Sequence, residues 1–233
     1  GDIDGLLAEH QAANYGIDVN QWLDTYFNWL VRPGSQVDSI AWCMDEGNIV
    51  GYPSKVTAVY EHPGLQKWFQ EGIDILQVAV TETHQQGLEA FYSYRINGPD
   101  HVGLENNQPK AAPLKEQHPD WLLDLFWYRP GVWNFAVPEV RDYKLAILRE
   151  LAENYDFDGL EINFSRQPLS LPTNYQWRYR NAMTDFMRRV RIMLQEIAKK
   201  RGRSFLLSAR IPSNPPGCHY DGRHYRIWKE RVF

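Results

Sequence analysis

The chain has 233 residues, a formal net charge of -4 and a hydrophobic fraction of 43%. This composition is enough for a sizeable core, and the acidic balance argues against a nucleic-acid-binding surface. Only two cysteines occur, Cys43 and Cys218, which excludes a disulfide framework and a four-cysteine zinc site. No apolar run has the length of a membrane span, so we expect a globular protein that binds neither nucleic acid nor membrane.

Apolar periodicity divides the chain into alternating helices and strands, which is typical of βα units around a parallel sheet. In chain order the expected elements are a helix over residues 20–31, a strand over 39–44, a helix over 63–86, a strand over 88–97, a helix over 138–155, a strand over 157–165, a helix through 183–197, a strand over 204–211 and a helix over 225–232. Between residues 98 and 131 no element is clear, and the aromatic residues there indicate a functional loop rather than disorder.

The spacing of these strands indicates an incomplete barrel. Their starts are 49, 69 and 47 residues apart, so eight strands cannot fit into 233 residues. We therefore expect a fold of the α/β class, a single domain over residues 1–233 that forms part of a (β/α)8 TIM-type barrel. About four parallel strands with crossover helices would be present, and the first and last strands absent. The remainder would come from sequence outside this chain or from another chain, because a half-barrel leaves its sheet edges unpaired.

Residues 157–165 place polar and apolar side chains on opposite faces of one expected strand. Glu161, Asn163 and Ser165 share a face, because side chains alternate along a strand. Active sites of (β/α)8 enzymes lie at the C-terminal ends of their strands. The candidate site residues at those ends are Asp45, Arg95, Asn97, His101, Glu161, Asn163, Arg166 and Arg210.

These residues suit the hydrolysis of a glycosidic bond, which requires a carboxylic acid near the leaving oxygen and a second carboxylate. Glu161 is the expected general acid/base, and Asp45 is the expected second carboxylate within this chain. Structural alternatives stay open for both residues. Glu161 is also placed to form an ion pair with Arg95 or Arg210, and the sequence around Asp45 is common in turns.

The other candidates at this edge would bind substrate. The expected sugar-binding residues are Arg95, Asn97, His101, Asn163, Arg166 and Arg210, with Trp127 or Trp133 stacking on sugar rings. Asp158 falls on the opposite face of its strand, so we expect it to contact a turn or a helix. His219, Asp221 and His224 lack the spacing of a metal site, and we expect neither a metal nor a cofactor.

The segment at residues 155–168, YDFDGLEINFSRQP, resembles the fourth-strand motif of the glycosyl-hydrolase-like TIM-barrel proteins called family-10-like. The matching residues are Tyr155, Asp158, Gly159, Glu161, Arg166 and Pro168. The segments PEVRDYKLAILRELAENY and YSYRIN also resemble that family. The resemblance implies a barrel that acts on a carbohydrate substrate, and a secreted or periplasmic location.

One residue departs from the family pattern. Asn163 stands where the family usually has an aspartate, and an amide cannot act as a carboxylic acid. Two hypotheses follow: a glycoside hydrolase acting on a poly- or oligosaccharide, and a non-catalytic carbohydrate-binding barrel. A different α/β enzyme, such as a metal-dependent hydrolase, is a third hypothesis. A chitinase-type barrel is excluded, because Ser165 stands at the position of that family's catalytic glutamate.

Overall fold

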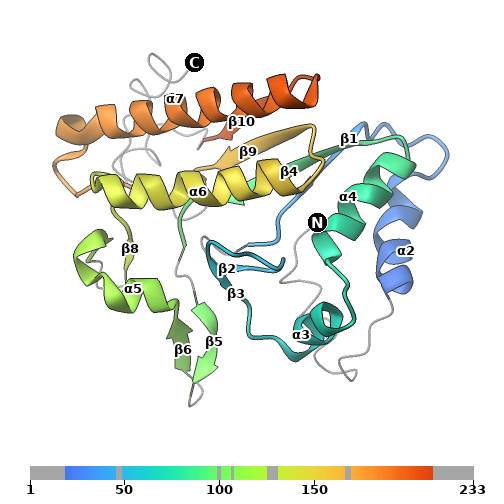
Figure 1. Ribbon diagram of the computed structural model, residues 1–233, viewed down its shortest axis with the longest axis horizontal. Helices are drawn as coiled ribbons and strands as arrows, with labels where there is room; N and C mark the ends of the chain where they lie inside the picture. Colours follow the sequence, from blue (N-terminus) through green and yellow to red (C-terminus); the bar gives the residue numbers. More distant parts are fainter. Residues whose placement is uncertain are drawn as a thin grey trace.

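A parallel sheet organises the molecule (Figure 1). The computed structural model describes residues 19–45, 49–98, 101–105, 108–124, 131–165 and 169–211. The main sheet has four parallel strands in the order β1 (Ser39–Trp42), β4 (Glu89–Arg95), β9 (Gly159–Asn163) and β10 (Leu206–Arg210). Because the strands are parallel, their C-terminal ends meet at one edge of the sheet.

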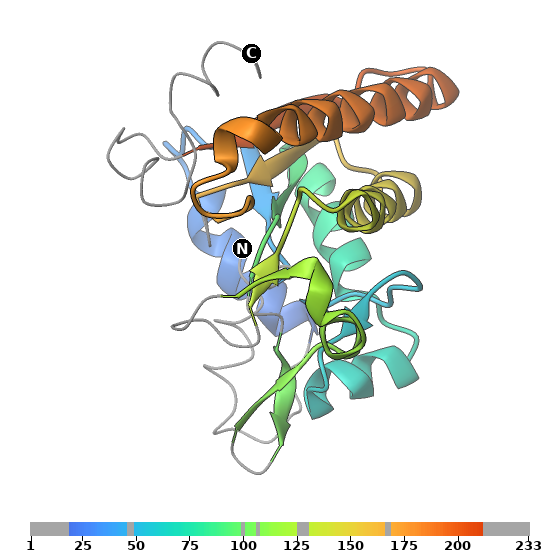
Figure 2. The ribbon, with the colours of Figure 1, turned by 90° about the vertical axis from the view of Figure 1, so that its left-hand side faces the viewer.

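Helices and small strand pairs connect the strands of this sheet. The helices are α2 (Val19–Leu30), α3 (Pro63–Gln70), α4 (Ile75–Gln85), α5 (Pro113–Gln117), the 3-10 helix η1 (Pro119–Trp121), α6 (Pro138–Asn154) and α7 (Gln176–Arg201). The small pairs are β2 (Ile49–Val50) with β3 (Ala58–Val59), β5 (His101–Glu105) with β6 (Gln108–Ala111), and β7 (Leu122–Leu123) with β8 (Val132–Trp133). Viewed from the side, α4, α6 and α7 lie on the same side of the main sheet (Figure 2).

The face of the sheet toward these helices is apolar. Trp42 on β1, Tyr92 and Tyr94 on β4, and Leu160 and Ile162 on β9 are fully buried in one core cluster. The helix residues in the same cluster include Leu76, Ala79, Val80, Ile147, Leu151, Phe186, Val190 and Leu194. Burial of these large side chains is the main stabilising contribution, at roughly 1.5–3 kcal/mol for each aliphatic or phenyl side chain.

The opposite face of the sheet carries the polar side chains that alternate with the apolar ones along β4 and β9. The parallel register places Ser93 of β4 beside Glu161 of β9, and Arg95 beside Asn163. At the start of β9, Gly159 allows close approach: a Cβ there would lie 2.5 Å from the Phe91 ring. The polar face predicted for residues 157–165 is therefore present, on a strand shorter than expected.

Three helices, two of them long, match the expectations from periodicity. The helix over residues 138–155 is confirmed as α6, with Pro138 in its first turn where a missing amide hydrogen is harmless. The helix through residues 183–197 is confirmed as α7, and it ends at Gly202, whose φ of +70° favours glycine. The helix over residues 20–31 is confirmed as α2.

The expectation of one helix over residues 63–86 was wrong. The segment forms α3 and α4, separated by a turn in which Gly72 has a φ of +76°. Asp74 then caps α4, because its carboxylate accepts hydrogen bonds from the amides of Leu76 at 3.0 Å and Gln77 at 3.3 Å.

The region between residues 98 and 131 contains elements that periodicity did not indicate. It holds the hairpin of β5 and β6, the short helices α5 and η1, and the strand β7. The expected helix over residues 225–232 lies outside the described residues. Within the described ranges the sheet does not close on itself, and the expected α/β fold with about four parallel strands and crossover helices is confirmed.

Candidate active site

Glu161 lies on the polar face of the sheet with a strand on each side. Its register partners are Ser93 on β4 and Ser208 on β10. Ser93 donates a hydrogen bond from Oγ to Glu161 Oε1 at 2.6 Å, and Arg210 Nε lies 3.1 Å from the same oxygen. The Glu161 side chain is 18% exposed, so the carboxyl group is held in place and still reached by solvent.

The structural alternative considered for Glu161 was an ion pair with Arg95 or Arg210, and the pair with Arg210 is present. The Arg210 side chain is 55% exposed, which makes the pair a partly solvated one with a modest contribution to stability. Oε1 takes both the serine and the arginine contact, and Oε2 has no hydrogen-bond partner among the described residues. A ligand that approaches this face therefore meets an oriented carboxyl group beside a guanidinium.

Asp45 follows β1 and is 1% exposed. Its Oδ1 accepts a hydrogen bond from the Arg95 amide at 3.1 Å, and Arg95 Nη1 donates to the Asp45 carbonyl oxygen at 3.4 Å. These contacts tie the end of β1 to the end of β4. Asp45 lies beyond the end of β1 and Glu161 lies on β9, and these two strands flank β4 in the sheet.

Two tyrosine hydroxyls lie in the field of the Asp45 carboxylate. Burial raises the pKa of Tyr92 well above its ordinary value, and the charge of Asp45 adds to the shift. Burial also raises the pKa of Tyr52, with Glu150 and Asp45 as further causes. Both phenols therefore stay protonated, and the surroundings of Asp45 are largely dry.

Asn97 was expected to bind substrate, and the structure assigns its amide to another task. Its Nδ2 donates to the carbonyl oxygens of Trp133 at 3.2 Å and Leu169 at 2.7 Å. Its Oδ1 accepts from the amides of Trp133 at 2.9 Å and Gly98 at 3.2 Å. The side chain is buried, so Asn97 joins three segments at the C-terminal end of the sheet and has no group left for a sugar.

Trp133 was expected to stack on sugar rings, and its burial contradicts this expectation. The indole is fully buried, with the Nζ atoms of Lys115 and Lys144 at 5.3 Å and 5.8 Å from its ring. Lys115 Nζ also donates to the carbonyl oxygens of Gly98 at 2.8 Å and Gly131 at 2.7 Å. A ring enclosed in this way offers no face to a ligand.

The remaining candidates divide into described and undescribed side chains. Arg95 and Asn163 are buried on the polar face, and Asn163 Oδ1 accepts a hydrogen bond from the Ser165 amide at 3.0 Å. The backbone of His101 belongs to β5, but its side chain lies outside the described part. Trp127 and Arg166 also lie outside it, as do His219, Asp221 and His224.

Asp158 lies just before β9, at the N-terminal end of the strands, and it contacts a helix residue, as was predicted. It accepts hydrogen bonds from the Ala90 amide at 2.9 Å and from Arg203 Nη1 at 2.8 Å, and it contacts His84 Nε2 at 2.9 Å. Tyr155 donates a hydrogen bond to Asp74 at 2.6 Å. Thus Tyr155 and Asp158, which match the family motif, have structural contacts.

Ser93 is the site residue that sequence reasoning missed. Its strand places it on the same face as Arg95, so alternation alone could have selected it. What alternation does not give is the partner across the sheet, which depends on strand order and register.

Within the described ranges no group of three or more His, Cys, Asp or Glu side chains could hold a metal ion. No helix of the described residues is long and apolar enough for a membrane span.

Comparison with known proteins gives matches to curated proteins, to solved structures and to a family model. Among curated proteins, Glycosyl hydrolase YngK of Bacillus subtilis (strain 168) is 32% identical over 98 residues, 40% of this chain and 18% of that protein. Glycosyl hydrolase DigH of Escherichia coli (strain K12) is 27% identical over 176 residues, 69% of this chain and 38% of that protein. The chain thus spans well under half the length of these relatives.

A solved structure and a family model complete the comparison. An alpha-L-fucosidase isoenzyme 2 from Paenibacillus thiaminolyticus is 17% identical, with a TM-score of 0.49, over 74% of this chain and 27% of that one. The family model described as Glycosyl hydrolase-like 10 matches residues 13–195, which include β9 and Glu161. The match covers most of the sequence, and the chain therefore belongs to the Glycosyl hydrolase-like 10 family.

Proposed function

We propose that this chain forms part of the catalytic domain of a glycoside hydrolase that cleaves a poly- or oligosaccharide. The observation that carries the proposal is the geometry of Glu161. Its carboxyl group stands on the polar face of β9, partly exposed, with Ser93 Oγ at 2.6 Å and Arg210 Nε at 3.1 Å. Family membership supports the same reaction class.

In this proposal Glu161 is the general acid/base that protonates the leaving oxygen of the scissile bond. Ser93 and Arg210 orient its carboxyl group, and Arg210 also reaches the substrate from the exposed side of the pair. Arg95, His101, Asn163, Arg166 and Trp127 are proposed to line the sugar site. Asp45 is the proposed second carboxylate, and its contact with the Arg95 amide keeps it fixed.

The test is Glu161→Gln in the full-length protein. The amide keeps the shape of the side chain but cannot deliver a proton, so hydrolysis should fall by about 100- to 10,000-fold. Oligosaccharide affinity should be retained. Product release from a panel of α- and β-linked oligosaccharides measures the first outcome, and calorimetry measures the second.

The matched control is Glu153→Gln, the same chemical change on the exposed surface of α6, where Glu153 pairs with Arg149 at 3.2 Å. Hydrolysis by the control should equal that of the parent protein. Unchanged turnover in Glu161→Gln, with a panel substrate that the parent cleaves, would reject the catalytic assignment.

A second candidate function is carbohydrate binding without catalysis. Two observations favour it: Asn163 stands where the family pattern has an aspartate, and Glu161 is paired with Arg210. This candidate predicts oligosaccharide binding by the full-length protein with no product after long incubation. Product formation that depends on Glu161 would exclude it.

A further inference from the structure

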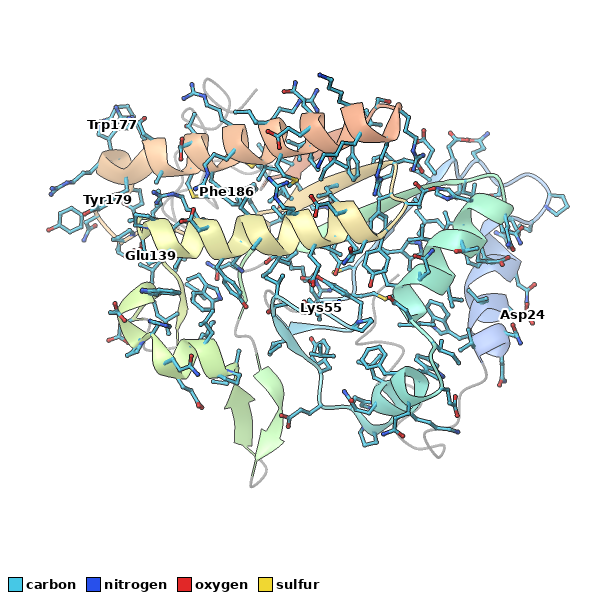
Figure 3. All side chains as sticks on the ribbon, in the orientation of Figure 1. Asp24, Lys55, Glu139, Trp177, Tyr179 and Phe186 are labelled. Atoms are coloured by element: carbon cyan, nitrogen blue, oxygen red, sulfur yellow. The ribbon has the colours of Figure 1, made fainter. Side chains whose placement is uncertain are left out.

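Two aromatic side chains stand exposed at the start of α7. Trp177 is 60% exposed and Tyr175 is 55% exposed, and Trp177 is the most exposed large hydrophobic side chain in the described ranges. Figure 3 shows Trp177 projecting from the end of α7, with Tyr179 at the same end of the helix. Neighbouring exposed aromatic side chains of this kind form a candidate binding surface.

This aromatic pair lies toward the same, C-terminal end of the strands as the candidate active site, with α7 on the apolar face of the sheet and Glu161 on the polar face. Helix α7 connects β9 to β10, which are parallel, so the helix runs opposite to both strands. Its first turn therefore lies toward the end of β9 that carries Glu161 and Asn163 (Figure 1). The loop that follows the candidate acid leads directly to Tyr175.

Arg180 fixes the orientation of the Trp177 ring. Its guanidinium carbon lies 4.1 Å from the ring centroid, and its Nη1 donates to the Trp177 carbonyl oxygen at 2.5 Å. This cation–π contact covers one face of the indole. The exposed area must then belong to the other face and the edge, which form a flat apolar surface with donor groups beside it.

The charges around the ring indicate what covers it. Arg178 lies 5.7 Å from the Tyr179 ring and has no ion pair among the described residues. An apolar protein surface placed over Trp177 would bury more of the Arg180 guanidinium group, whose Nε has no hydrogen-bond partner among the described residues, and this is unfavourable. A sugar ring presents an apolar C–H face to the indole and hydroxyl acceptors to the guanidinium groups.

We propose that Trp177, with Tyr175 and Arg180, forms an accessory subsite for a sugar ring of a long saccharide, apart from the point of cleavage. This inference rests on the proposed function for the identity of the ligand class. The subsite binds a sugar unit in the part of the saccharide that extends beyond the site of Glu161. It contributes affinity for long saccharides and none for short ones.

The experiment compares binding with and without the indole. The full-length Glu161→Gln protein and the double variant Glu161→Gln/Trp177→Ala are titrated with cellohexaose, chitohexaose and maltohexaose, and with the matching disaccharides. The Kd of the best-bound hexasaccharide should rise roughly three- to tenfold on loss of the indole, the size of a single aromatic contact. The disaccharide Kd should not change. Trp177→Phe should restore part of the affinity.

A control on the same helix is Ile192→Ala, which removes another exposed apolar side chain away from the first turn. It should leave every Kd unchanged. The proposal is overturned if Trp177→Ala binds the hexasaccharide as well as its parent does. An equal rise in Kd for the hexasaccharide and the disaccharide would overturn it as well, and so would the absence of binding of any of these saccharides to the parent protein.

These outcomes separate the subsite from the proposed function. The titration uses a protein without the candidate acid, so it does not depend on turnover. If the wild-type protein releases no product yet binds the hexasaccharide through Trp177, the catalytic proposal fails and the subsite stands. If it hydrolyses the hexasaccharide with the same KM in both Trp177 forms, the subsite fails and catalysis stands.

Discussion

Asp158 shows how much one carboxylate does at the N-terminal end of the sheet. It contacts His84 of α4, the Ala90 amide at the start of β4, and Arg203 just before β10. Burial alone would raise the pKa of Asp158. The hydrogen bonds from His84 and Ala90, with the charges of His84 and Arg203, outweigh it and lower the pKa below its usual value.

We expect Asp158→Asn to lower the free energy of unfolding by about 1–3 kcal/mol at pH 7, since it weakens hydrogen bonds to a charged group. Because the folded pKa is lowered, the contribution of the carboxylate is complete above the unfolded value and disappears as pH falls through the folded value. The difference between wild type and variant should therefore shrink from about pH 5 downward. Urea unfolding at pH 7, 5 and 3 measures it.

The control for this prediction is Asp156→Asn, because Asp156 also pairs with Arg203 but is mostly exposed. Its effect should be smaller at every pH. A difference for Asp158→Asn that stays constant between pH 7 and pH 3 would contradict the assignment of the stabilisation to the charged form.

For single residues, the sequence predicted on which face of a strand a polar side chain lies better than it predicted which groups that side chain contacts. Alternation correctly separated Glu161 from Asp158, since it needs only the strand itself. The tasks of Asn97 and Trp133 depend on Leu169, Gly98 and other residues far along the chain. No local pattern predicts which loop a buried amide will bind.

Among the elements, the turn between α3 and α4 depends on Asp74. This residue caps α4 and also accepts a hydrogen bond from the Tyr155 hydroxyl at 2.6 Å. Burial raises the pKa of Asp74, and the bond from Tyr155 opposes that shift. One side chain thus joins a helix terminus to the segment that precedes β9.

We expect Asp74→Ala to cost about 2–4 kcal/mol of stability, from the lost cap and from the buried Tyr155 hydroxyl left without an acceptor. Asp74→Asn should cost less, since asparagine also caps helices. Denaturant midpoints of the three proteins measure the order. An alanine variant as stable as the asparagine variant would show that the cap contributes nothing.

The sequence predicted the ends of an element where an apolar stripe stops at a residue that begins or ends helices, such as proline or glycine. Helices α6 and α7 have long apolar stripes with Pro138 or Gly202 at an end, and both were predicted. The apolar stripe across residues 63–86 continues past Gly72 and Asp74, so periodicity does not reveal the turn between α3 and α4. The hairpin of β5 and β6 pairs strands too short and too polar for periodicity to detect.

For the molecule as a whole, the parallel sheet and the chain-order arrangement of its four strands followed from the expected βα units, while the register of the strands did not. Within the described ranges β10 pairs only with β9, and Leu206 at its start is half exposed on the polar face. An edge strand with an exposed leucine favours association between copies.

We expect the 233-residue chain to self-associate at micromolar concentrations and Leu206→Lys to reduce this, because an edge lysine opposes strand pairing. Size-exclusion chromatography with light scattering gives the mass of each protein over a concentration series. Ile192→Lys on α7 serves as the control, since it adds the same charge away from the edge. Equal masses for the Leu206 and Ile192 variants would show that the edge is not the contact.

The lysines on either side of Trp133 have one more consequence. Both Nζ atoms are enclosed, Lys115 against two carbonyl oxygens and Lys144 against the Tyr94 hydroxyl at 3.2 Å. An acylating reagent in solution cannot reach an enclosed amine until the surrounding segments separate. The acylation rates of these two lysines therefore report how often the C-terminal end of the sheet opens, and the measurement needs no ligand.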